Sequence, residues 1–401
     1  MSAPTPVPGA RGLDALNALV AGGQTGFGAF IAVHLTAQAW TQGDIGQALA
    51  VGTVVAMASQ VPAGALVDRM RSKRLAIAFG GGAVACSALL FAATAARLPV
   101  LLAEVLHGFA SCMIGPAIAA ISLQLAGHAG LGERLGRNAR FASIGSAASA
   151  LALGGIGTWG SGRAVFWATA AMMVAGLLVV LAAPSPMVAL PAPGAAPPAP
   201  MRLRALLDRR LLAFAACVAG FHLSNAAMLP LVAGEVTRAA GSRANLVIAA
   251  CIVAPQAIVA LASPLVGRRA ESWGRRPVLL LGFAALPLRG VLLALDAGPA
   301  WVMAVQALDG ISAAALGVLM PLVAADLTRN GGFSAALGVL GLAAGAGATL
   351  STGLAGLVAD RFGPAAALLA LAAAGAAAMA GLLAVPETRP LPARNPGTAV
   401  S

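Results

Sequence analysis

The chain has 401 residues, of which 59% are hydrophobic and only 9% are charged. Soluble proteins carry about 25% charged residues, so this composition excludes a soluble enzyme, a disordered protein and a fibrous repeat, and it predicts that lipid surrounds most of the chain. The formal net charge of +12 does not indicate nucleic-acid binding, because the basic residues form short clusters between apolar segments and not one continuous basic face.

Apolar runs of membrane-spanning length follow one another along the chain. A hydrocarbon core about 30 Å thick requires about 20 apolar residues per helix. Breaks at charges and at Gly/Pro turns separate twelve such runs, which predict an all-α integral membrane protein with twelve transmembrane helices. The predicted spans are 13–37, 45–67, 75–96, 100–126, 141–159, 164–183, 211–234, 245–267, 277–295, 300–325, 335–359 and 364–385.

A proline-rich segment divides these spans into two sets of six. Residues 184–200 contain seven prolines, which is typical of an extended linker, and residues 201–210 form a short basic amphipathic stretch. The predicted organisation is a cytoplasmic N-terminal tail (1–12), an N-terminal six-helix bundle (13–183), a cytoplasmic linker (184–210), a C-terminal six-helix bundle (211–385) and a cytoplasmic C-terminal tail (386–401).

The distribution of basic residues predicts the orientation of the spans. If the N-terminus is cytoplasmic, 19 of the 25 Lys and Arg fall in cytoplasmic segments and five in the loops of the other side. Cytoplasmic loops of membrane proteins carry such an excess. We therefore expect both termini in the cytoplasm and the protein in the plasma (inner) membrane.

Both halves carry a similar loop motif after their second span. The first copy reads Gly64-Ala-Leu-Val-Asp-Arg-Met-Arg-Ser-Lys-Arg and the second Gly267-Arg-Arg-Ala-Glu-Ser-Trp-Gly-Arg-Arg. Duplicated six-helix halves are typical of secondary transporters, with a substrate site near the midplane. The small residue lets helices approach, and the carboxylate can pair with arginines or cap a neighbouring helix. The candidate gating residues are Gly64, Asp68, Arg69, Lys73, Arg74, Gly267, Glu271, Gly274, Arg275 and Arg276.

This loop resembles the signature of the major facilitator superfamily, Gly-x-Leu-x-Asp-Arg-x-Gly-Arg-Lys. Arg71 and Ser72 replace its second Gly and the following Arg, and the second copy has Glu271 for Asp. The resemblance covers residues 11–385 and implies two pseudo-symmetric six-helix bundles that alternate access. Two exporter motifs are altered: Glu104 stands where proton-driven exporters often carry Arg, and the fifth span lacks the Pro of their Gly-Pro ending.

Ionisable and amide side chains inside the spans are functional candidates, because burying them in lipid is costly. The superfamily arrangement implies that spans 1, 4, 7 and 10 line the central cavity, and every ionisable group inside a span except Arg289 falls on these four spans. Glu104 and His107 share one helix face, and His34 lies near the same end of its span, so a meeting of the three is expected. The proton-coupling candidates are Glu104, His107, Asp309 and His34. The substrate-cavity candidates are Asn17, Gln24, His222, Asn225 and Gln306.

Arg289 and Asp309 lie at nearly equal depth on either side of the turn near Gly298. Each charge would be costly alone in the membrane, so the sequence predicts an intramembrane ion pair. The pair serves either as a structural lock or as a switch that opens when Asp309 takes a proton or substrate.

These features predict a secondary active transporter of a small organic solute, with proton-coupled efflux (proton antiport) favoured. Proton-coupled uptake or uniport of a metabolite is the alternative, and a non-transporting membrane sensor on the same fold is a third reading. The sequence lacks a phosphate-binding GxxxxGK[ST] loop, metal-ligand spacing and a nucleophile elbow. We therefore expect no enzymatic activity, cofactor or metal. The expected partners are the solute, protons and the bilayer, without nucleic acid, and the protein is expected to be a monomer.

Overall fold

The computed structural model describes residues 10–27, 29–182, 206–232, 244–295, 298–329 and 331–389. Regular structure within these ranges is α-helical. Most of the predicted linker and the outer parts of both predicted tails (1–9 and 390–401) lie outside the described residues. The helices are α1 (Ala10–Thr25), α2 (Ala29–Ala37), α3 (Gln42–Arg69), α4 (Lys73–Ala93), α5 (Arg97–Trp159), α6 (Gly162–Ala182), α8 (Arg209–Asn225), α10 (Ala244–Trp273), α11 (Arg275–Ala294), α12 (Pro299–Leu327), α13 (Phe333–Phe362) and α14 (Pro364–Ala384).

Ten stretches of the described chain are long and apolar enough to cross a membrane. The longest is α5, whose 63 residues would form a straight rod of about 95 Å, roughly three times the hydrocarbon thickness. The chain turns at Gly127, where φ is 63° and ψ is −179°, a conformation that glycine adopts without steric cost. This helix therefore contains the fourth and fifth predicted spans. The all-α membrane architecture agrees with the predicted fold class and is consistent with twelve spans.

Two predicted boundaries were wrong. Residues 127–140 were expected to form a loop because they carry three arginines, but helix resumes directly after Gly127. The first span was expected to be continuous over 13–37, but it breaks between α1 and α2. Four of the seven residues 22–28 are glycine, and each glycine costs about 1 kcal/mol of helix stability relative to alanine, which explains the break.

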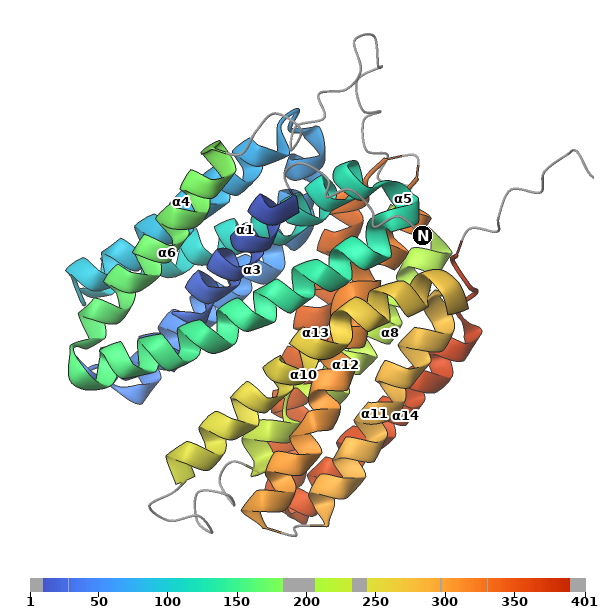
Figure 1. Ribbon diagram of the computed structural model, residues 1–401. Coiled ribbons are helices and arrows are strands. Elements are labelled where there is room, and N and C mark those ends of the chain that lie inside the picture. The colour runs from blue at the N-terminus through green and yellow to red at the C-terminus, as the bar shows by residue number, and fades with distance from the viewer. Residues whose placement is uncertain are drawn as a thin grey trace, which may run out of the picture.

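The two halves lie side by side in Figure 1, with α1–α6 coloured blue to green and α8–α14 coloured yellow-green to red. They contact each other through the pairs α3–α13 and α5–α10. The described chain begins and ends at the same end of the molecule, close to the turns at 70–72, 127 and 274. We call this end the terminal face and the opposite end the distal face.

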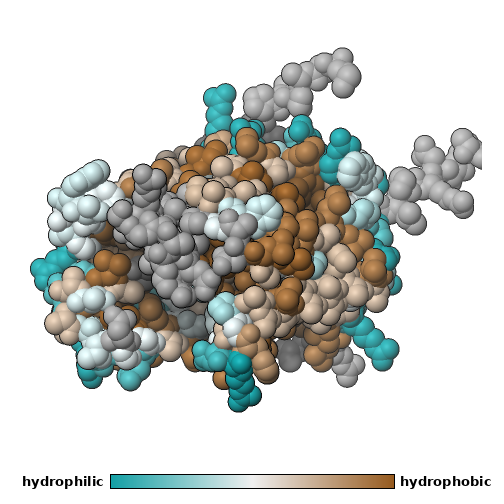
Figure 2. Space-filling view, turned by 90° about the horizontal axis from the view of Figure 1, so that it is seen from below, coloured by the Kyte–Doolittle hydropathy of each residue, from teal (hydrophilic) through white to brown (hydrophobic). Residues whose placement is uncertain are grey.

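Apolar side chains fill the interior and also cover the outside of the bundle. One buried cluster spans both halves and includes Leu135 of α5, Leu319 of α12 and Leu337 of α13. Large apolar residues such as Leu151 (65% exposed) and Leu261 (73% exposed) point outward, and Figure 2 shows brown, hydrophobic residues over much of one face with teal groups at its margins. An outer surface of this kind requires lipid as its solvent.

Candidate functional site

Asp68, at the terminal-face end of α3, contacts the opposite half of the molecule. Its carboxylate accepts hydrogen bonds from the backbone N–H groups of Ser334 (2.9 Å) and Ala335 (3.0 Å) at the start of α13. These N–H groups have no acceptor within their own helix, and a negative charge there also interacts favourably with the helix dipole. Gly64, one turn earlier, lies against the backbone of Ser334 and Ala335, so a side chain at residue 64 would separate the helices.

Glu271 makes the corresponding contact from the second half to the first. Its carboxylate accepts a hydrogen bond from the backbone N–H of Glu133 (3.2 Å), in the first turns of α5 after Gly127. Gly267 and Gly132 meet backbone to backbone at this crossing. The two carboxylates of the duplicated motif thus each cap a helix of the other half, and both do so at the terminal face.

Among the basic residues of the first loop, Lys73 stabilises the turn after α3. Lys73 donates from Nζ to the carbonyl oxygens of Asp68 (3.1 Å) and Met70 (2.9 Å), which closes the end of α3. Arg69 is exposed, and Arg74 is half-buried.

The second loop is tied to the end of the chain. Gly274, with φ of 106°, precedes α11, and the side chain of Arg275 forms a buried ion pair with Asp326 (2.9 Å). Glu387 accepts hydrogen bonds from the backbone N–H groups of Arg275 (2.8 Å) and Arg276 (2.9 Å). Burial alone would raise the pKa of Glu387, but the N–H donors and the charge of Arg275 outweigh it, and the net pKa lies below the ordinary value.

A buried charge network that the sequence analysis missed joins α1 to α5. Asp14 forms ion pairs with Arg134 and Arg137. Arg134 also donates from Nε to Asn138 Oδ1 (2.9 Å), and Asn138 donates to Ser122 (2.7 Å). The spacing of Arg134, Arg137 and Asn138 places them on neighbouring parts of a helix surface. That signal was hidden because the segment was predicted to be a loop.

In the C-terminal half, a polar cluster forms around Arg289 of α11, which is 2% exposed. Its guanidinium donates to Gln306 Oε1 (3.0 and 2.7 Å), to Asp309 Oδ1 (2.9 Å) and to Asn225 Oδ1. Asp309 keeps 24% of its side chain exposed. Three helices thus supply the donor and its acceptors. The charged acceptor, Asp309, keeps part of its side chain exposed, whereas Gln306 is fully buried.

In the N-terminal half, Glu104 is 3% exposed and packs against the backbone of Gly52. Its oxygen Oε1 has no hydrogen-bond partner within the described residues. The ring of His107 stacks on Phe27, with 3.9 Å between ring centroids, and its Nε2 likewise lacks a partner in the described part of the chain.

His34 does not meet Glu104 and His107 as expected. Its ring packs on Phe166 (5.2 Å between centroids), Phe166 stacks on Phe91 (5.1 Å), and Phe91 contacts Phe27 (6.3 Å). Because Phe27 carries the stacked ring of His107, three phenylalanines link the two histidines.

The remaining substrate-cavity candidates do not form a cluster with one another. Asn17 donates back to Leu13 of its own helix (2.7 Å), Gln24 is half-buried on α1, and the ring of His222 contacts that of Phe221 (5.4 Å). The structure therefore brings Asn225 and Gln306 together around Arg289, and it leaves Asn17, Gln24 and His222 outside that cluster.

Comparison with known proteins gives one consistent family. The sequence model of the Major Facilitator Superfamily matches residues 15–254 and 225–400. Uncharacterized MFS-type transporter Rv2456c of Mycobacterium tuberculosis (strain H37Rv) is 37% identical over 390 residues, covering 94% of this chain and 93% of the relative.

Solved structures show the same fold at low sequence identity. The human organic anion transporter MFSD10 has a TM-score of 0.70 and 15% identity, covering 94% of this chain and 98% of that structure. The proton:xylose symporter XylE has a TM-score of 0.73 and 12% identity, with 94% and 95% covered. The E. coli fucose:proton symporter FucP has a TM-score of 0.71 and 17% identity, with 94% and 98% covered.

Proposed function

The chain belongs to the major facilitator superfamily, and on that premise we propose that it exports a small organic solute in exchange for protons. The single observation that carries proton coupling is Glu104, which is 3% exposed and has an oxygen without a hydrogen-bond partner among the described residues. An unpartnered carboxylate is costly in an apolar environment, so the protonated form is favoured while this site is closed. A change of conformation that hydrates Glu104 would release the proton.

The direction of opening follows from the proposed orientation. With both termini in the cytoplasm of the plasma (inner) membrane, as the positive-inside rule indicates, the terminal face is cytoplasmic. The contacts of Asp68 and Glu271 then hold the cytoplasmic side closed, as in the outward-facing or occluded members of an alternating-access cycle. The protein works as a monomer, because each half supplies the contacts that close the other.

The solute is proposed to bind between the halves, near the cluster around Arg289. Asp309 is the accessible acidic member of this cluster. When Asp309 accepts a proton or a substrate group, it releases the guanidinium of Arg289. Uptake by proton symport is the second candidate, because XylE and FucP, which share the fold, are proton symporters by name.

The test is a proton-flux assay with purified protein in liposomes that contain a pH-sensitive dye. Amphipathic drugs, sugars and organic acids are added in turn, and both solute and proton movement are recorded. We expect one class of solute to move protons in the opposite direction, and we expect Glu104→Gln and Asp309→Asn to abolish the proton signal. The matched control is Asp44→Asn, because Asp44 pairs with Arg97 at the surface.

Each outcome separates the candidates. Solute and proton moving in the same direction would establish uptake by symport. Solute movement without a pH change in the wild type would contradict proton coupling and leave uniport. An unchanged proton signal in Glu104→Gln would remove Glu104 from the mechanism.

A further inference from the structure

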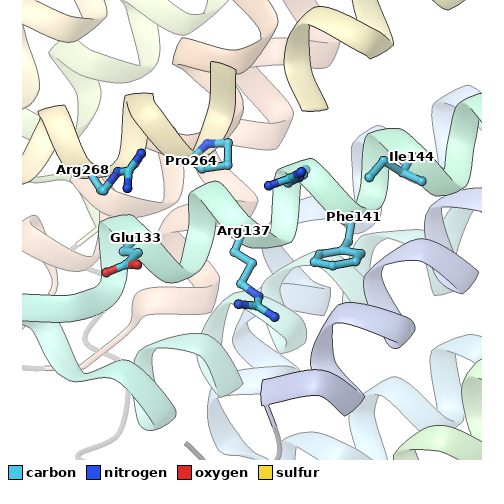
Figure 3. Close-up of a pocket in the computed structure, with 7 residues that line it drawn as sticks. Glu133, Arg137, Phe141, Ile144, Pro264 and Arg268 are labelled. Carbon is cyan, nitrogen blue, oxygen red and sulfur yellow. The ribbon is translucent and has the colours of Figure 1, made fainter. Parts of the chain in front are cut away.

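A cavity of about 430 Å³ lies between α5 and α10 at the terminal face. Figure 3 shows Glu133, Arg137, Phe141 and Ile144 along α5, opposite Arg268 on α10. Arg140 also lines the cavity. The cavity therefore joins the two halves beside the crossing of Glu271 and the Glu133 N–H.

Three of the seven lining residues are arginines. Arg137 forms an ion pair with Asp14 (2.6 Å), but the side chains of Arg140 and Arg268 have no ion-pair partner in the described ranges of the chain. Glu133 is the single acidic lining residue. Unpaired guanidinium groups beside one cavity favour an anion with several oxygens, above all a phosphate, which they bind through paired N–H groups.

The cavity opens toward the outside of the bundle. On α5, Leu131 and Leu135 are buried in the cluster between the halves, whereas Arg137 and Ile144 lie on another side of the helix and are exposed. Ile144 is seven residues beyond Arg137, about 10 Å deeper along the helix, and is 44% exposed. The cavity is thus cationic at its rim and apolar toward the predicted membrane core.

We propose that this cavity binds the headgroup of an anionic phospholipid. The phosphate lies between Arg140 and Arg268, and an acyl chain runs along Phe141 and Ile144. Basic pockets between helices on the cytoplasmic side suit such headgroups. A lipid bound to both α5 and α10 adds a link between the halves and favours closure of the terminal face. The site itself does not depend on the proposed function. Only the assignment of the cavity to the cytoplasmic side of the membrane rests on it.

The test is lipid binding by the full chain in detergent, measured by native mass spectrometry with dioctanoyl phosphatidylglycerol. A surface charge contributes about 1 kcal/mol to attraction for anionic lipid, so we expect about fivefold weaker binding for Arg140→Gln and roughly 30-fold weaker binding for Arg140→Gln/Arg268→Gln. Glu133→Gln removes the acidic group, so we expect about fivefold tighter binding, which a merely unfolded variant would not give.

The matched control is Arg163→Gln/Arg361→Gln, which removes the same charge from the distal face and is expected to bind like the wild type. Equal weakening in this control would overturn the proposal, and so would equal binding of dioctanoyl phosphatidylcholine. If glycerol 3-phosphate, at the same concentration as the lipid, displaced all of the bound lipid, the site would be one for soluble phosphates and the proposed lipid site would be overturned. The assay involves no transport, so failure of the proposed function leaves its result unchanged.

Discussion

At the scale of single residues, Arg289 has several partners, and these set the effect of each substitution. Asp309 supplies the negative charge, while Gln306 and Asn225 supply neutral oxygens. The equal depth of Arg289 and Asp309 can be counted from the sequence around the Gly298 turn. The contact of Asn225 with Arg289 could not be predicted in this way, because the two residues are 64 positions apart in the sequence and meet only through the packing of α8 against α11.

We expect Arg289→Asp and Asp309→Arg each to destabilise the protein strongly, since removing one member of a buried pair costs about 3–5 kcal/mol. The double exchange Arg289→Asp/Asp309→Arg should recover much of that loss, because the amide groups of Gln306 and Asn225 can rotate and donate to the new carboxylate. Thermal unfolding in detergent measures all three proteins. No recovery in the double variant would mean that the ion pair does not carry the stability.

The Asp14 network predicts a ranking of two arginines that share one carboxylate. The side chain of Arg134 is 8% exposed and that of Arg137 is 51% exposed. Arg134→Gln should therefore cost about 3–5 kcal/mol of unfolding free energy, whereas Arg137→Gln should cost less than about 1 kcal/mol. Denaturant unfolding compares them, and equal losses would contradict the assignment of the buried pair.

At the scale of elements, apolar length predicted the helices better than it predicted their ends. Hydropathy finds a segment that lipid must surround, but it cannot show that Arg134 is neutralised by Asp14 from a distant helix, so the charged start of the fifth span was predicted as a loop. Similarly, the contact of Phe27 with His107 depends on the break between α1 and α2, which twelve uniform spans do not contain.

The end of α14 and the start of α11 form a pH-dependent contact. Because the net pKa of Glu387 is lowered, its ionised form stabilises the fold: the contribution is complete above the ordinary value of 4.5 and is lost as the pH falls through the lowered pKa. We expect Glu387→Gln to speed hydrogen exchange of the Arg275 and Arg276 amides about fivefold at pH 7, as for loss of a helix cap.

The comparison is made by exchange mass spectrometry at several pH values, each with the wild type beside the variant. The two proteins should converge in acid, where Glu387 of the wild type is protonated and therefore neutral like the glutamine of the variant. Asp360→Asn, a surface carboxylate at the distal face, is the control. A difference that persists unchanged in acid would contradict this role of the Glu387 charge.

At the scale of the whole molecule, the two crossing carboxylates should act together. Asp68 and Glu271 each cap a helix of the other half, and loss of a cap costs about 1 kcal/mol. We expect Asp68→Asn or Glu271→Gln to shift the equilibrium about fivefold toward an open terminal face, and the double variant roughly 30-fold if the two contacts are independent.

Spin labels at Arg71→Cys and Arg329→Cys would report the distance between the loops that follow α3 and precede α13. Asp360→Asn again serves as the control and should leave the distance distribution unchanged. A double variant that still resembles the wild type would show that glycine packing alone, at Gly64 and Gly267, keeps the terminal face closed.

The aromatic composition gives the molecule an optical signal of its own. The chain has five tryptophans and no tyrosine, and Trp273 lies two residues beyond Glu271. The Arg269 guanidinium lies 4.7 Å from the centre of the Trp273 ring, which is 54% exposed, whereas Trp40 and Trp301 are held by N–H bonds to carbonyl oxygens. Movement of the end of α10 would change the surroundings of Trp273 directly, so we expect the Trp273 part of the intrinsic fluorescence to report opening of the terminal face in the unlabelled protein.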